Sequence, residues 1–138
     1  MTTTLLSPEA MRLGGVLLLA LATIAYGGTF VLRVTRGSFP ATEFQRRFFR
    51  AGHAHAGVLV LLALATQPYV DAAALEGVVG VVARSGIAAA AIVLPAGFFF
   101  SATGRGTERP NRWIALVWAG AAVLTVSVVT LGVGLLAA

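Results

Sequence analysis

The sequence contains no cysteine and no lysine, and it has only two histidines. Without cysteine the chain can form no disulfide, thiolate metal site, iron–sulfur cluster or cysteine nucleophile. Charge is also scarce, because 11% of the residues are charged, whereas soluble chains average roughly 25%. A soluble domain of 138 residues could not hide a chain that is 58% hydrophobic, since small domains leave much of their surface exposed. The composition therefore predicts an integral membrane protein whose apolar surface faces lipid.

The net charge of +5 comes from arginines that lie mostly between long apolar runs. Arginines in that position act as signals for membrane orientation and as contacts for anionic lipids. They do not form the continuous basic face of a nucleic-acid reader. We therefore expect the lipid bilayer, and no nucleic acid, as the partner of these charges.

Four apolar stretches are close to the ~20 residues that a helix needs to cross a bilayer. They cover residues 13–32, 53–70, 77–100 and 113–136. The sequence thus predicts an all-α fold, an integral membrane four-helix bundle that forms a single transmembrane domain over residues 1–138. A weak match of HAGVLVL in the second stretch to WAGAAVL in the fourth leaves open that the bundle consists of two similar helical hairpins.

The loops between these stretches differ in charge. The first loop is basic and contains Arg33, Arg36, Arg46, Arg47 and Arg50 with a single acid, Glu43. The second loop is acidic and contains Asp71 and Glu76. The third loop is basic and contains Arg105, Arg109 and Arg112 with Glu108. By the positive-inside rule the basic loops are cytoplasmic and both termini face outward, as in a multi-pass protein of the cell membrane. Arg84 is an exception inside the third stretch, and we expect it to reach toward Glu76 or Asp71.

Two further patterns concern the helices. Thr42 followed by Gln45 is typical of a capping box that starts a helix. The residues after it, EFQRRFFR, form either an interfacial amphipathic stretch or the basic end of one long helix. The pairs Gly52 with Ala56 and Gly86 with Ala90 have the spacing that lets membrane helices approach closely.

One segment, FRAGHAHAG, contains ionisable groups that suggest a site. It places Arg50, His53 and His55 at the cytoplasmic start of the second span, where such groups are costly and therefore indicate function. In a helix, positions two apart point about 200° away from each other. His53 and His55 therefore cannot bind the same metal ion while both are helical.

Three functions remain open for this segment. Arg46, Arg50, His53 and His55, with Arg112 from the other basic loop, are candidates to bind a phosphate or carboxylate headgroup. Alternatively, His53 and His55 bind haem or a transition metal. A His-x-His pair is similar to a motif in the catalytic subunit of haem–copper oxidases, although nothing else matches, and a second haem ligand would require a homodimer. The third possible function is an integral membrane enzyme that acts on a lipid-like or isoprenoid substrate, with His53 as general acid or base. The sequence leaves open whether the chain is an enzyme.

The segments FRAGHAHAGVL and LPAGFFFS, with the RPNR-to-LGVGL end, suggest a family. In these segments the chain resembles a group of uncharacterised small four-span membrane proteins of high-GC Gram-positive bacteria. The resemblance implies the architecture and carries no activity. Our first hypothesis is therefore a small membrane binding or accessory protein with its ligand site at the cytoplasmic end of the second span. We expect it to form a homo-oligomer or part of a larger membrane complex.

Overall fold

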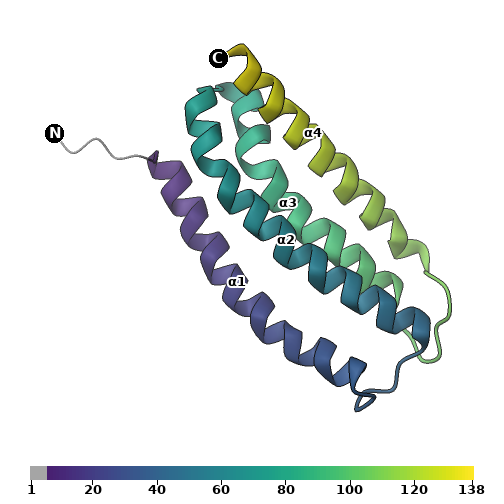
Figure 1. Cartoon of the computed structure of the whole chain (residues 1–138). Coiled ribbons are helices and arrows are strands. Elements are labelled where there is room, and N and C mark those ends of the chain that lie inside the picture. The colour runs from purple at the N-terminus through teal and green to yellow at the C-terminus, as the bar shows by residue number, and fades with distance from the viewer. Residues whose placement is uncertain (1–5) are drawn as a thin grey trace.

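The computed structural model describes residues 6–138, which form four long helices (Figure 1). These helices are α1 (Pro8–Thr35), α2 (Glu43–Ala73), α3 (Gly77–Ser101) and α4 (Ala115–Ala137), and a 3-10 turn, η1 (Arg112–Ile114), leads into α4. The described part of the chain contains no strand. Each of the four helices, α4 with its leading turn, is long and apolar enough to cross a membrane. The predicted all-α, four-helix membrane architecture is confirmed.

Helix α2 begins at Glu43, well before the apolar stretch that starts at His53. The predicted capping box explains why the helix starts at this position. Thr42 Oγ1 accepts from the Gln45 amide at 3.2 Å, and Gln45 Oε1 accepts from the Thr42 amide at 3.1 Å. Because these bonds satisfy backbone donors at the helix start, EFQRRFFR forms the basic end of one long helix.

The start of α4 is built differently. Asn111 Oδ1 accepts from the Trp113 amide at 2.9 Å, and the chain passes through η1 before the α-helix begins. The first turns of α2 and α4 therefore have different caps. The similarity of the two helical hairpins stays a prediction.

The helices pack in chain order. Helix α1 packs chiefly on α2, α2 packs on α3, and α3 has its most extensive contacts with α4. In Figure 1, α1 and α4 lie on opposite sides of the α2–α3 pair, and the start of α1 and the end of α4 lie at the same end of the molecule. We call this the terminal end. The loops 36–42 and 102–111 lie at the other end, which we call the basic end.

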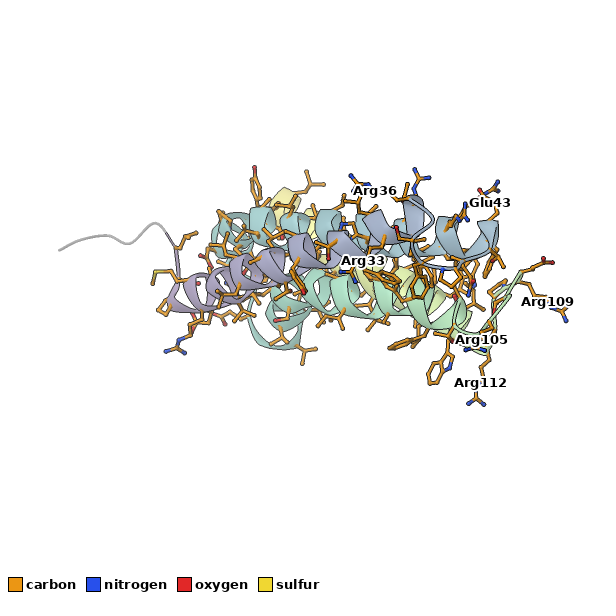
Figure 2. The ribbon with its side chains drawn as sticks, turned by 90° about the horizontal axis from the view of Figure 1, so that it is seen from below. Arg33, Arg36, Glu43, Arg105, Arg109 and Arg112 are labelled. Carbon is orange, nitrogen blue, oxygen red and sulfur yellow. The ribbon has the colours of Figure 1, made fainter. Side chains whose placement is uncertain are left out.

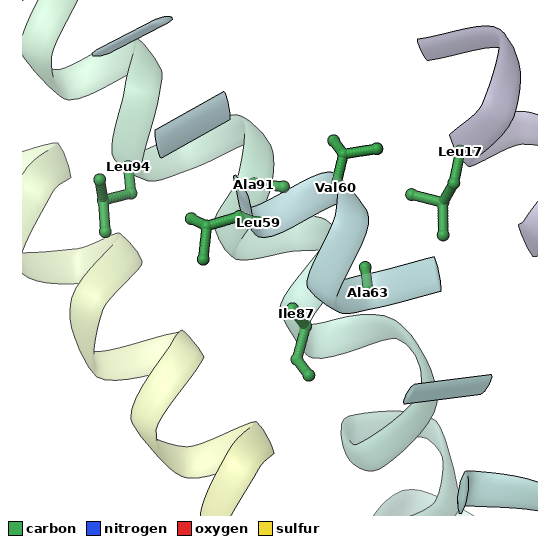
Figure 3. Close-up of a cluster of buried hydrophobic side chains, with 7 residues drawn as sticks. All are labelled: Leu17, Leu59, Val60, Ala63, Ile87, Ala91 and Leu94. Atoms are coloured by element: carbon green, nitrogen blue, oxygen red, sulfur yellow. The ribbon is translucent and has the colours of Figure 1, made fainter. Parts of the chain in front are cut away.

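The main buried cluster joins the first three helices (Figure 3). Its members are Leu17 of α1, Leu59, Val60 and Ala63 of α2, and Ile87, Ala91 and Leu94 of α3. Most large apolar side chains outside it remain uncovered by protein, for example Leu19 and Trp118, each 73% exposed. A soluble monomer rarely exposes apolar surface on this scale, so the natural solvent of these faces is lipid.

Glycines allow α3 to approach its neighbours closely. A Cβ at Gly86 would overlap the Ser127 hydroxyl of α4, and a Cβ at Gly52 would lie 2.8 Å from the Phe99 ring of α3. The small-residue contacts predicted at Gly52 and Gly86 are therefore present. Gly97 and Gly120, which the sequence did not single out, bring α3 and α4 equally close.

Candidate functional site

The two basic loops are held together at the basic end. Thr42 Oγ1 donates to the Thr107 carbonyl at 2.5 Å, and the buried Gln45 Nε2 donates to the carbonyls of Ala102 at 2.9 Å and Gly104 at 2.7 Å. The capping residues of α2 thus tie its start to the loop between α3 and α4. This connection concentrates the arginines of both loops at one end of the molecule.

Figure 2 shows the consequence for charge. Its labelled residues lie in the half of the molecule away from the start of α1. They are Arg33, Arg36, Glu43, Arg105, Arg109 and Arg112. Glu43 already pairs with Arg47 at 2.9 Å on the exposed start of α2. The basic end therefore has a positive surface suited to anionic lipid headgroups.

Arg46, Arg50 and His53 lie on one face of α2, since their spacing of four and three residues matches the helical repeat. This face is directed toward α1: a Cβ at Gly28 of α1 would lie 3.3 Å from His53 Nε2. Arg50 is exposed and His53 is half-buried. His53 therefore lies at the α1–α2 boundary, and Arg46 and Arg50 share its face of α2.

Arg46 is the unusual member of this group. Its Nε is fully buried and has no hydrogen-bond partner, the one buried side-chain nitrogen or oxygen in this condition within residues 6–138. Leaving a buried donor unsatisfied typically costs about 1–3 kcal/mol, and more when the group is charged. The protein therefore provides no hydrogen-bond acceptor for the Arg46 Nε–H group.

His55 lies apart from this group. Its ring stacks on Phe98 of α3, with centroids 5.1 Å apart, and its Nδ1 lies 2.8 Å from the Ala51 carbonyl oxygen. Because a carbonyl oxygen only accepts, Nδ1 carries the proton and the Nε2 of neutral His55 is an acceptor. His53 faces α1 and His55 faces α3, which agrees with the 200° separation predicted for two residues two positions apart.

A metal site receives no support from this arrangement. The chain from residue 6 to 138 contains no group of three or more His, Cys, Asp or Glu residues that could hold a metal ion. A haem on His53 or His55 would need its second axial ligand from another copy of the chain, because the two imidazoles face different helices.

Arg112 is not brought to the α1–α2 boundary. Its guanidinium carbon lies 5.6 Å from the ring centroid of its neighbour Trp113, and its side chain is exposed. In Figure 2 it points away from Arg36 and Glu43, on the other side of the basic end. We therefore leave Arg112 out of the group formed by Arg46, Arg50 and His53.

The structure also shows an ionic network at the terminal end. Arg84 Nη2 lies 2.5 Å from Asp71 Oδ1, one of the two partners that the sequence predicted, and Arg84 Nη1 donates to Gln67 Oε1 at 3.2 Å. Ser7 donates to Asp71 through its amide and its hydroxyl, both at 2.8 Å. Gln67 and Ser7 were missed. The spacing of Gln67 and Asp71, one turn apart on an apolar helix, is the signal that would have shown the first of them.

Comparison with known proteins finds no family model, no curated protein and no solved structure that matches the chain.

Proposed function

We propose that this protein is a membrane binding protein that holds an anionic headgroup, a phosphate or a carboxylate, at the basic end of α2. Arg46, Arg50 and His53 form the site. The observation that carries the proposal is the alignment of two arginines and a histidine on one accessible face at the basic end of α2. Four apolar helices support the membrane location, and the headgroup is our inference from the charge and geometry at α2.

The chemistry of the three side chains fits this ligand. A guanidinium donates charge-assisted hydrogen bonds to phosphate and carboxylate oxygens. The Arg46 Nε is buried, but the side chain as a whole is partly exposed and can therefore meet a headgroup. The exposed Arg50, one turn further along α2, adds a second positive charge on the same face. His53 closes the group against α1 at Gly28. A headgroup at this depth keeps its acyl chains beside the apolar faces of the helices.

We expect Arg46→Gln to weaken binding of a short-chain phosphatidic acid by tenfold or more, because a charge-assisted hydrogen bond contributes about 1.5–3 kcal/mol. The measurement is a lipid titration of the full-length protein in detergent, followed by native mass spectrometry. Arg47→Gln is the matched control, since Arg47 is the next residue, equally charged and exposed in its pair with Glu43. It removes only diffuse attraction, about 1 kcal/mol per arginine near the surface.

Equal losses in the two variants would mean diffuse attraction to the basic end and no site at Arg46. The same purified sample decides the haem alternative. A Soret band that disappears in His55→Ala, together with unchanged lipid binding in Arg46→Gln, would replace the headgroup with haem as the ligand.

We also propose that the basic end is cytoplasmic and that the membrane is the cell membrane. The charge difference between the two ends supports this orientation. Because the chain has no cysteine, single cysteines report it directly. We expect a membrane-impermeant maleimide to label Ala138→Cys in intact cells and Ser38→Cys only after lysis, both positions being exposed. Labelling of Ser38→Cys in intact cells would reverse the orientation.

A further inference from the structure

A groove of about 560 Å³ opens at the terminal end between the start of α1 and the start of α3. Its walls are apolar for much of their area, with Leu13 of α1 and Val81 of α3 among them. Four polar side chains also line it, namely Glu9, Arg12, Arg84 and Ser85. The groove lies at the opposite end of the molecule from the proposed headgroup site.

The groove exists because small residues face it and because α1 packs on α2. Gly77 and Gly80 of α3 line the groove and have no side chains to fill it. A side chain at Gly80 could not be added, since its Cβ would overlap the Leu75 carbonyl oxygen. Helix α1 makes its main contacts with α2, so its first turns do not close over α3. The sequence thus keeps this space open.

The groove contains charges of both signs that remain available to a ligand. Arg84 uses N–H groups on Gln67 and Asp71, and a guanidinium carries further donors beyond those. Glu9 and Arg12 are exposed, and neither forms an ion pair with any residue from 6 to 138. Asp71 is already occupied by Ser7 and Arg84. Two guanidiniums and one carboxylate therefore face the groove beside apolar walls.

The positions of these charged side chains along the helices suit a lipid ligand. Arg84 lies about two turns from the start of α3, or roughly 10 Å along the helix at 1.5 Å per residue. Glu9 and Arg12 lie in the first turns of α1, nearer the terminal end. Val16 of α1 also lines the groove and lies one turn deeper than Arg12, so a molecule with a charged head at this level and an apolar tail along Val16 satisfies both kinds of wall.

We propose that this groove binds one zwitterionic phospholipid, with its phosphate on Arg12 and Arg84 and its ammonium group on Glu9. Two guanidiniums alone would favour any anionic headgroup. The carboxylate of Glu9 adds a partner for a cation and repels a headgroup that has only negative charge. The site therefore favours a headgroup that contains both a phosphate and an ammonium group over one that contains a phosphate alone.

The test uses the full-length protein in detergent, with Arg46→Gln as the background so that the basic end contributes little. The probes are dioctanoyl phosphatidylethanolamine, dioctanoyl phosphatidylglycerol and inorganic phosphate. We expect the phosphatidylethanolamine to bind at least fivefold more tightly than the phosphatidylglycerol. Arg12→Gln should weaken both about tenfold, and Glu9→Gln should remove the preference between them. Inorganic phosphate at the lipid concentration should not displace either lipid.

Arg12 and Glu9 are exposed, so their replacement leaves the packing of α1 intact, whereas Arg84 belongs to the ionic network. Arg109→Gln, an equal loss of charge at the basic end, is the control and should change nothing. Equal affinity for the two lipids, or lipid binding unaffected by Arg12→Gln, would overturn the proposal. Displacement by inorganic phosphate would also overturn it and indicate a soluble anion as the ligand.

Discussion

Replacing Asp71 by alanine is expected to lower the free energy of unfolding by about 3 kcal/mol, because removal of one partner of a largely covered ion pair leaves an uncompensated charge. The side chains of Arg84 and Asp71 are only 20% and 18% exposed, so water screens the pair weakly. Asp71 also anchors Ser7, which caps the start of α1. The substitution therefore weakens the contact of α1 with α2 as well as the position of Arg84.

The measurement is reversible unfolding of the purified protein in mixed micelles, followed by circular dichroism. Glu76→Ala is the matched control, because Glu76 is exposed at the same end and forms no ion pair with residues 6–138. It should change the stability by less than about 0.5 kcal/mol. The double variant Asp71→Ala/Arg84→Met should recover part of the loss, since it also removes the orphaned charge. An Asp71→Ala variant as stable as Glu76→Ala would show that Arg84 reaches water and does not need its carboxylate.

Replacing Gly120 by alanine is expected to lower the free energy of unfolding by about 3 kcal/mol, an unusually large effect for one methyl group. The new Cβ would lie 2.6 Å from Leu94 Cβ and 2.7 Å from the Leu94 amide nitrogen. Backbone atoms cannot rotate away, so α4 would have to move from α3 along their whole contact. The contact between α3 and α4 is the most extensive in the bundle, and a small displacement there is felt at many residues.

Gly15→Ala is the control for this substitution. Gly15 lies in the interior of α1, and a Cβ there would meet nothing within 4 Å. Alanine has a helix propensity better than glycine by roughly 1 kcal/mol, so Gly15→Ala should be neutral or stabilising. Equal stability of the two variants in the same unfolding assay would show that α3 and α4 are less closely packed than the structure indicates.

The two proposed sites differ in what they require from the fold. The basic site depends on one helix, because Arg46, Arg50 and His53 follow one another on α2. The groove depends on the relative position of α1 and α3, and it includes Arg84, whose orientation is set by Asp71 and Gln67. We therefore expect lipid binding in the groove to be lost with Asp71→Ala while binding at Arg46 persists.

The sequence alone determined the features that depend on composition and on neighbouring residues. Four apolar stretches specify four membrane helices, because a spanning segment must satisfy its own backbone hydrogen bonds. Thr42 and Gln45 specify the start of α2 within a single turn. The opposite directions of His53 and His55 follow from helical geometry and need no knowledge of the neighbouring helices.

Only the tertiary structure decided which helix faces which. It placed Asp71, Ser7 and Gln67 in one network with Arg84, and it brought Gly120 against Leu94. It also buried Arg46 Nε, placed Arg112 away from Arg36 and Glu43, and left the groove open between α1 and α3. These features could not be read from the chain, because apolar helices present similar surfaces to lipid and to one another. Their pairing is selected by shape and by a few polar contacts between residues distant in sequence.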